Sequence, residues 1–339
     1  MQAFKEKIRD YQIRWRKTYL LQIKEDGRQN GKNYPHILPW KERLENFYEP
    51  IRAVLFNKNN GYLEKNKVTP HSGIHNLLSS WVLCVNMYWP FNNSAGYEVL
   101  AAFLREQTGI DIREITDMEL EYEECDVNFK PQNLLGENSG KRGSGQTSPD
   151  LAIKFKTADE RKGIILFESK FTEESFYVCS GYKKRANDDK LINPDRNRCL
   201  NTTALVNSNF CECHLTNWHR RYWDLLEVEL NKSKFIELNR CPMSCGCYQL
   251  FRQGALAKGL SNKYDIIISG VVTDQRNDKI KKSGRSTGMA ELPTGWNELF
   301  PNMDFVWISH NDWYLYVKEN NALGEWSKWL AYVGERYFY

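Results

Sequence analysis

Two short segments carry side chains that together could hydrolyse a phosphodiester. Asp150 opens segment 150–156, while Glu168 and Lys170 close segment 163–170. Both segments are rich in strand-forming residues, so we expect two strands joined by a polar turn. Side chains two apart in a strand share a face, so Glu168 and Lys170 point the same way, and Asp150 can reach them from the neighbouring strand. Two carboxylates suit Mg²⁺, and a nearby lysine can orient or deprotonate a water.

The same three residues could instead form an ion-pair cluster on a solvated sheet face. Glu168 directly follows the run 164–167, which is apolar enough for a buried central strand. A charged pair at the end of a buried strand favours a catalytic site over a surface cluster.

Several helices are expected to precede this strand pair. Apolar periodicity and capping residues predict them over 3–24, 40–57, 70–89, with a start at Thr69-Pro70, and 94–109. Further strands are expected at 118–129, 265–272, 304–308 and 313–317, and a helix at 249–260. The prediction is an α/β fold with a mixed central sheet flanked by helices. Its parts are a helical N-terminal region (1–90) and a core (91–339) that carries a cysteine-rich insertion at about 171–247.

The Pro149-Asp150 and Glu168-Ser169-Lys170 segments resemble the motif of the PD-(D/E)xK nuclease superfamily. Segments 78–86, 168–173 and 249–252 resemble a restriction-endonuclease-like family within that superfamily, over roughly residues 70–270. The resemblance implies a restriction-endonuclease-like core. It also implies an endonuclease that uses Mg²⁺ or Mn²⁺ to hydrolyse DNA, in a restriction or defence role, with RNA as a second possible substrate.

The resemblance also implies further site residues. A glutamate on the first core helix often joins the metal ligands in that superfamily, and Glu98 is the candidate; Glu106, Glu121 and Glu123 are alternatives. Gln249 matches a position that supports DNA or metal in related nucleases. Arg252, one helical turn later, could contact phosphate or pair with an acidic side chain.

Basic segments at 1–24, 183–198 and 276–285 could hold a phosphate backbone if they converge in space. The net charge of +4 alone does not argue for nucleic acid, and solvated loops are an equally good interpretation. The basic candidates for nucleic-acid contact are Lys183, Lys184, Arg185, Lys281 and Lys282.

Nine cysteines, with no secretion signal and no apolar run of about 20 residues, predict reduced thiols in a cytoplasmic protein that has no membrane segment. Four of five cysteines at the two ends of the insertion could close a tetrahedral Zn²⁺ site, with His214 spare. Cys179 and Cys199 could extend this set or supply an iron–sulfur cluster, and ordinary thiols are the remaining alternative. The five cysteines are Cys211, Cys213, Cys241, Cys245 and Cys247.

Two other functions are compatible with the sequence. One is a nucleic-acid-binding module that has a nuclease-like fold and does not cut, and the other is a protein-interaction scaffold that uses the aromatic C-terminal segment. A nuclease with one site per chain that cuts both strands would favour a homodimer. The intact Asp150, Glu168 and Lys170 set favours the endonuclease.

Overall fold

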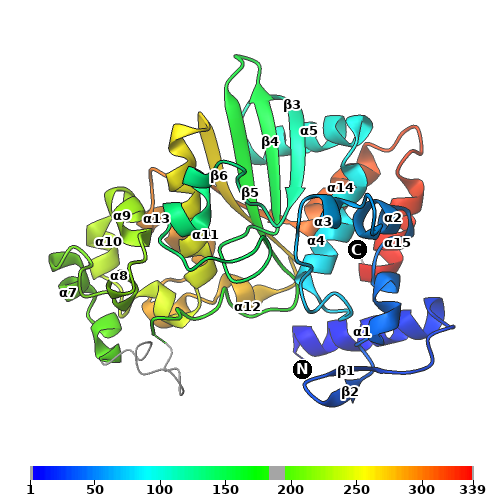
Figure 1. Cartoon of the computed structure of the whole chain (residues 1–339), viewed down its shortest axis with the longest axis horizontal. Helices are drawn as coiled ribbons and strands as arrows, with labels where there is room; N and C mark the ends of the chain where they lie inside the picture. Colours follow the sequence, from blue (N-terminus) through cyan, green and yellow to red (C-terminus); the bar gives the residue numbers. More distant parts are fainter. Residues whose placement is uncertain (1–2, 183–194, 338–339) are drawn as a thin grey trace.

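A computed structural model of the chain describes residues 3–182 and 195–337. Its centre is a five-stranded sheet in the order β3-β4-β5-β6-β7 (Figure 1). β4 runs antiparallel to its two neighbours, β3 and β5, whereas β5, β6 and β7 are parallel. The predicted mixed sheet is therefore confirmed. The strands are β3 (Ile112–Leu120), β4 (Leu151–Thr157), β5 (Lys162–Lys170), β6 (Ile266–Thr273) and β7 (Phe305–Ser309).

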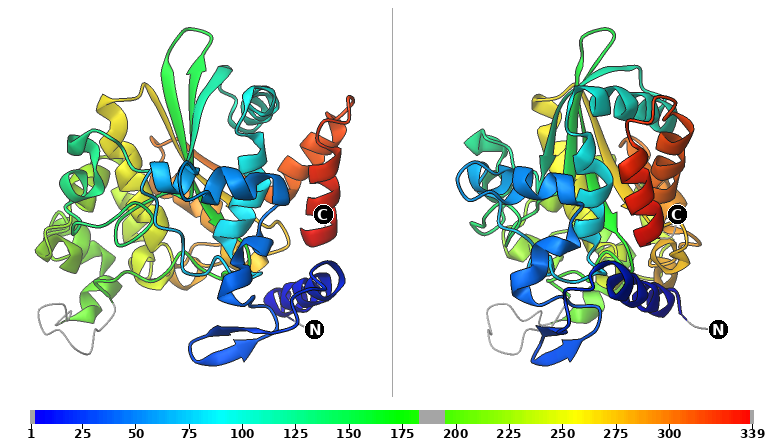
Figure 2. Two further views of the ribbon diagram at one scale, coloured as in Figure 1. Left: turned by 45° about the vertical axis from the view of Figure 1, so that its right-hand side comes forward. Right: turned by 90° about the vertical axis from the view of Figure 1, so that its right-hand side faces the viewer.

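Alternate residues of the central strands enter two different cores. Ile153 of β4 and Ile165 of β5 belong to one core, while Ala152 and Leu166 belong to the other. This alternation follows from the period of two in a strand, and it requires both faces of the sheet to be covered. Both faces are indeed packed with helices (Figures 1 and 2).

The helices on the two faces come from different parts of the chain. The first face carries α4 (Ser80–Tyr88), α5 (Ser94–Thr108), α14 (His310–Glu319) and α15 (Ser327–Tyr337). The second face carries α9 (Tyr222–Leu226), α11 (Tyr248–Gly259), α13 (Leu292–Leu299) and most of the insertion. The aromatic C-terminal segment packs into the first core, where Trp329 and Tyr337 are buried. This location agrees with a packing role.

The helix expected over 3–24 is present as α1 and ends at Tyr19. The N-terminal region also contains a hairpin that the sequence did not predict. The hairpin lies near α1 below the lower end of the sheet (Figure 1). The expected helix 40–57 is split into a 3₁₀ turn and a short α-helix. The elements are α1 (Phe4–Tyr19), β1 (Gly27–Gln29), β2 (Lys32–Tyr34), the 3₁₀ helix Trp40–Asn46, α2 (Glu49–Phe56) and α3 (Tyr62–Lys65).

The helix predicted over 70–89 begins only at Ser80, so its first half was wrong. Backbone groups in the preceding residues bond to another segment, because Leu77 N donates to His36 O at 3.0 Å and Leu38 N donates to His75 O at 2.8 Å. Ser79 then caps α4 by accepting from Val82 N at 3.3 Å. Long-range pairing has replaced the local helical bonds.

Two strand predictions also need correction. Segment 313–317 lies in α14, which Ser309 caps and which buries Trp313 and Val317 one helical turn apart. The strand expected over 118–129 ends at Leu120, and Glu121 adopts a left-handed φ of 50°. In the first case the strand-forming residue types were outweighed by helical packing of Trp313 and Val317, and in the second case a turn was missed.

The insertion lies between β5 and α11 and consists of short helices around their own apolar contacts. Phe210 and Trp223 stack with their ring centroids 3.6 Å apart at its centre.

No helix within the described ranges is both long and apolar enough to cross a membrane. The other helices are α6 (Pro131–Leu134), α7 (Thr202–Asn207), α8 (His214–Asn217), α10 (Lys232–Ile236) and α12 (Asp278–Lys281).

Candidate active site

Three carboxylates occupy neighbouring positions on three adjacent strands. Leu120, Leu151 and Phe167 are paired across β3, β4 and β5. The next residue at this edge is an acid on each strand: Glu121 after β3, Asp150 before β4 and Glu168 within β5. Glu121 N donates to Asp150 O at 3.1 Å, and Ser169 N donates to the Asp150 carboxylate at 2.8 Å. The sheet register therefore brings the three acids together.

Lys170 lies beside these acids and is almost completely buried. Its ammonium donates to Glu168 Oε1 at 2.6 Å, and only 3% of the residue surface is exposed. Burial lowers the pKa of Lys170, but the carboxylates of Glu168, Glu173 and Asp150 raise it more, so the net pKa is above its ordinary value. The ion pair with Glu168 therefore favours the charged ammonium form of Lys170.

Asp150 and Glu121 have strongly perturbed acidities. Burial raises the pKa of both carboxyl groups well above the ordinary value, and the negative charge of Glu168 raises each further. The charge of Asp150 also raises the pKa of Glu121. Like charges held close together in a poorly solvated site destabilise one another. A divalent cation would relieve this repulsion.

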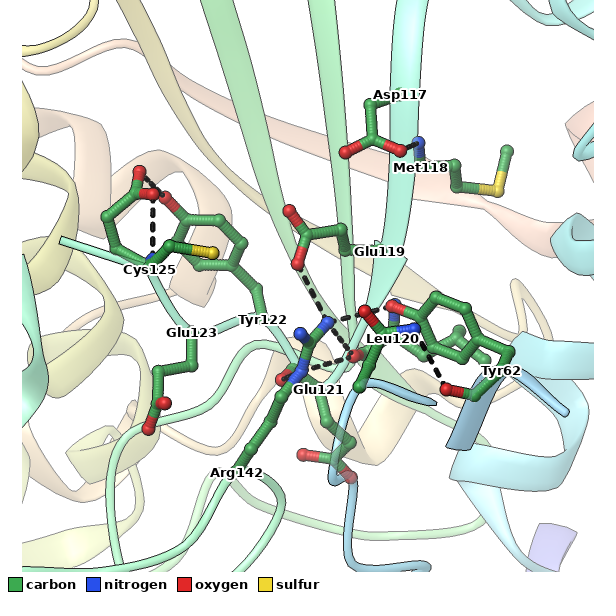
Figure 3. A network of polar contacts seen from close by, with 12 residues as sticks. Tyr62, Asp117, Met118, Glu119, Leu120, Glu121, Tyr122, Glu123, Cys125 and Arg142 are labelled. Carbon is green, nitrogen blue, oxygen red and sulfur yellow. Dashed lines mark hydrogen bonds and ion pairs between the residues drawn. The ribbon is translucent and has the colours of Figure 1, made fainter. Parts of the chain in front are cut away.

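Arg142 fixes the end of β3 from which Glu121 projects. Its guanidinium donates to the carbonyl oxygens of Leu120 and Glu121, both at 2.8 Å, and to the Tyr62 hydroxyl at 2.7 Å (Figure 3). Arg142 also pairs with Glu119 at 2.8 Å. The carboxylate of Glu121 points away from this guanidinium (Figure 3). Arg142 thus holds the backbone of Glu121 and leaves its carboxylate facing the other acids.

Gln249, which belongs to α11, supports Glu168 from the second face of the sheet. Its Nε2 donates to Glu168 Oε1 at 2.7 Å, so this oxygen accepts from both Gln249 and Lys170. The Gln249 Oε1 atom is buried and has no hydrogen-bond partner among the described residues. An unpartnered buried oxygen beside a carboxylate cluster fits a site that takes up a hydrated cation or another donor.

Asp150 and Glu168 line a cavity of about 370 Å³, and Glu121 is buried beside Asp150 without lining the cavity itself. The cavity walls come from α1, the hairpin segment and the residues after β5, so distant parts of the chain meet at it. Tyr177 is half-exposed there, adopts a left-handed φ of 57°, and places its ring 5.4 Å from the Lys170 ammonium. Besides Asp150, Glu168, Lys170 and Gln249, the lining includes Lys5, Gln29, His36, His71, Glu173 and Tyr177.

Glu98 is not brought to this cavity. It is exposed on α5 and is absent from the described residues that line the cavity. Glu106 is also exposed, and Glu123 pairs with Lys130 at 3.0 Å. Of the four glutamates considered as a third acid, the structure places Glu121 with Asp150 and Glu168.

The basic residues predicted to contact nucleic acid do not gather at one place among the described residues. Arg252 pairs with Glu137 at 3.3 Å and bonds to Thr147 at 3.0 Å, which is the acid-pairing alternative. Lys281 and Lys282 are half-buried in or beside α12. This segment lies next to the site because Asn277 donates to Glu173 O at 2.8 Å. Lys183, Lys184 and Arg185 lie outside the described residues.

The five cysteines predicted to bind zinc do not come together as one set. Cys211 is exposed, and Cys245 and Cys247 lie beside each other. Cys213 and Cys241 instead approach Cys179 and Cys199. As the side chains stand, no group of three or more His, Cys, Asp and Glu residues in the described ranges is arranged to hold a metal ion. Mg²⁺, however, is commonly bound by one or two protein carboxylates together with waters and substrate phosphates.

Sequence reasoning identified Asp150, Glu168, Lys170 and Gln249 but gave no role to His71 or Tyr177. His71 lines the cavity, and burial lowers the pKa of its imidazole. Both lie in irregular segments, where neither periodicity nor spacing indicates which side chains meet the acids. A half-exposed aromatic residue two positions before a cysteine gave no usable signal.

Comparison with known proteins gives one match. The sequence model of the family described as "REase-ARP: Restriction Endonuclease associating with ARP" matches residues 10–338. No curated protein and no solved structure matches the chain.

Proposed function

This chain belongs to the REase-ARP family of restriction endonucleases, and we propose that it is a metal-dependent endonuclease of the PD-(D/E)xK type that hydrolyses DNA. The observation that carries the proposal is the row of Glu121, Asp150 and Glu168 at one edge of the sheet, with the Lys170 ammonium 2.6 Å from Glu168. The family description supports DNA as the substrate and a restriction or defence role.

The carboxylates of Asp150, Glu168 and Glu121 would hold the metal. When bound, Mg²⁺ or Mn²⁺ supplies Lewis-acid stabilisation of the charge that develops on the phosphate and the leaving oxygen. Glu168 Oε1 accepts from Lys170 and Gln249, so Oε2 is the oxygen left for this role. Gln249 keeps the Glu168 carboxylate in one orientation.

Lys170 acts as an electrostatic group in this proposal. The Lys170 ammonium, which pairs with Glu168 at 2.6 Å, would donate to a phosphate oxygen or orient the attacking water. In the reaction a P–O bond to the water oxygen forms and the P–O bond to the leaving 3′ oxygen breaks, while the water proton passes to solvent and the leaving oxygen takes up a proton from solvent.

The cavity walls suit a polyanionic substrate. Lys5 from α1 lines the cavity, and Asn277, which directly precedes α12 with its Lys281, bonds to the segment that follows β5. Basic side chains around a hydrolytic centre would bind the flanking phosphates. One site per chain would cut both strands most simply as a homodimer, so a dimer on duplex DNA is part of the proposal.

A cleavage assay tests the proposal. Wild-type protein is incubated with plasmid and single-stranded DNA in Mg²⁺, Mn²⁺ or EDTA, beside Asp150→Asn and the control Asp117→Asn, which changes an acid on β3 away from the cavity. We expect metal-dependent cutting that Asp150→Asn abolishes and Asp117→Asn retains.

Other outcomes assign other functions. DNA binding by the wild type without cutting in any metal would indicate a binding module with a nuclease-like fold. Cutting of RNA alone would change the substrate class. Neither binding nor cutting of any nucleic acid would indicate an interaction scaffold.

A further inference from the structure

Tyr177 adopts a backbone conformation that aromatic residues rarely take. Its φ of 57° lies in the left-handed region that favours glycine. A residue with a Cβ atom is strained in this region, and the conformation persists only where the surrounding structure imposes it. Strain of this kind is concentrated at sites of function, and Tyr177 lies in the wall of the cavity that Asp150 and Glu168 line. The ring is therefore a candidate for contact with the substrate.

Backbone contacts with the start of α11 impose this conformation. Phe176 N donates to Gly246 O at 2.7 Å, and Gln249 N donates to Phe176 O at 2.9 Å. Tyr248 N donates to Tyr177 O at 3.2 Å. The Phe176 side chain is completely buried, whereas Tyr177 is 54% exposed. The chain is thus fixed at Tyr177, and a large aromatic side chain is held in an exposed position.

The ring of Tyr177 borders the proposed hydrolytic centre. The Lys170 ammonium lies over this ring, 5.4 Å from its centroid, within the range of a cation–π contact. Lys170 is the group that would contact the scissile phosphate or the attacking water. A substrate group that packs on Tyr177 would therefore belong to the nucleotide that adjoins this phosphate.

An exposed aromatic ring beside a phosphate-binding group suits a nucleobase. Bases stack on aromatic side chains in proteins that bind single strands, and this stacking tolerates any sequence because every base has a π-face. In a duplex both faces of a base are covered by its neighbours. A base that stacks on a protein ring must therefore come from a single strand, or must leave the stack of the duplex.

We propose that Tyr177 forms a base-stacking subsite for the nucleotide next to the scissile phosphate. The subsite takes an unpaired base, so single-stranded DNA binds to it directly and duplex DNA releases one base from its stack at the cut position. This inference rests on the proposed function, because Lys170 and the carboxylates define the position of the phosphate. It adds the class of substrate, which is DNA with an unpaired base at the cut position.

Binding to two strands of equal charge tests the inference. A short DNA strand and an abasic strand of the same length have the same phosphates, but only the first has bases. Fluorescence anisotropy in Ca²⁺ gives the affinities of the wild type, Tyr177→Ala, Tyr177→Phe and the control Tyr19→Ala. Tyr19 is also about half-exposed, on α1, and does not line the cavity.

We expect Tyr177→Ala to bind the strand with bases on the order of tenfold more weakly than the wild type, with its affinity for the abasic strand unchanged. Tyr177→Phe and Tyr19→Ala should bind both strands as the wild type does. The loss in Tyr177→Ala should be smaller on matched duplex DNA, because opening a base pair offsets part of the stacking. An equal loss on the two strands, no loss on either, or a larger loss on the duplex would overturn the proposal.

Tyr177→Gly covers the case in which Tyr177→Ala does not fold. Glycine adopts a positive φ without strain, so we expect a folded variant that loses the same base-dependent part of the affinity. Wild-type affinity of folded Tyr177→Gly for the strand with bases would overturn the subsite.

Binding and cleavage separate this inference from the nuclease proposal. A wild type that prefers the strand with bases through Tyr177 but cuts no DNA in any metal would retain the subsite and contradict the nuclease. A wild type that cuts DNA but binds the two strands equally would retain the nuclease and overturn the subsite.

Discussion

The electrostatic environment of each acid at the candidate site depends on its immediate neighbours. Glu168 is neutralised by Lys170, whereas Asp150 and Glu121 are held close to other carboxylates. This imbalance distinguishes Glu121 from Glu98, which is exposed on α5. The sequence could identify Asp150, Glu168 and Lys170 because apolar strand residues adjoin them. It could not rank Glu121 above Glu98, because a left-handed turn and strand pairing bring Glu121 to the site.

Replacement of the third acid gives the first prediction. Glu121→Gln should lower the cleavage rate on the order of 100-fold, because it removes one carboxylate from the metal-binding group. Glu98→Gln should leave the rate within about twofold of the wild type, since Glu98 does not reach the cavity. Single-turnover cleavage at fixed Mg²⁺ measures both. A large loss of cleavage in Glu98→Gln, together with a wild-type rate in Glu121→Gln, would show that Glu98 is the third acid.

At the scale of elements, a buried side chain of α4 holds together the helices that cover the first face of the sheet. Asn86 of α4 is fully buried, donates to Asn46 O at 3.1 Å and to the Tyr337 hydroxyl at 2.9 Å, and accepts from Tyr48 N at 2.8 Å. One amide thus connects α4, the segment 46–48 and α15. The sequence indicated α4 by its apolar run but could not show where α4 begins, because residues before Ser80 bond to the 36–38 segment.

Asn86→Ala should lower the free energy of unfolding by about 2–4 kcal/mol, because several buried partners lose their hydrogen bonds. Asn320→Ala, which removes a single exposed hydrogen bond at the end of α14, should cost less than about 1 kcal/mol. Urea unfolding followed by circular dichroism compares the two. Equal losses of unfolding free energy in the two variants would contradict the central position of Asn86.

The junction of β5 and α14 gives a pH prediction. His310 is fully buried between Ser169 Oγ (3.3 Å) and the Tyr88 hydroxyl (3.4 Å). Burial lowers the pKa of His310 to about 3, although the charge of Asp274 opposes this shift. The unfolded chain takes up this proton near pH 6.5 and the folded chain does not. The contribution of His310 to the free energy of unfolding is therefore fully present above about pH 6.5 and is lost progressively as the pH decreases toward 3.

The expected slope from this histidine is up to about 1.4 kcal/mol per pH unit below pH 6.5. His310→Gln should flatten the dependence of the unfolding free energy on pH between about pH 4.5 and 6.5, whereas the exposed-site variant His219→Gln should not. Urea titrations at several pH values measure the slope. An unchanged slope in His310→Gln would show that His310 takes up its proton in the folded state as well.

At the scale of the whole molecule, segments far apart in the sequence meet at or beside one cavity. Lys5 of α1 lines it, and α12 with Lys281 lies beside the residues that follow β5. Apolar patterns were sufficient to predict the two-faced sheet. The approach of the N-terminal hairpin and α12 to the cavity depends on tertiary packing, which local patterns do not encode.

The salt dependence of DNA binding should report this convergence. The double variant Lys281→Ala/Lys282→Ala should reduce the slope of log affinity against log salt by about two, because two phosphate contacts are lost. Lys156→Ala, at the opposite end of the sheet, should leave the slope unchanged. Fluorescence anisotropy in Ca²⁺ at several salt concentrations measures it. Equal slopes for all three proteins would place the DNA elsewhere.

The central claim is that Lys170 and the adjacent acids form a hydrolytic centre. The most direct measurement compares DNA cleavage in Mg²⁺ by the wild type, Lys170→Ala and Lys154→Ala, with folding checked by circular dichroism. Lys154 is the matched control, since it also pairs with carboxylates but lies on β4 outside the cavity. We predict cutting by the wild type and Lys154→Ala and none by Lys170→Ala. Wild-type cleavage by folded Lys170→Ala would contradict the claim.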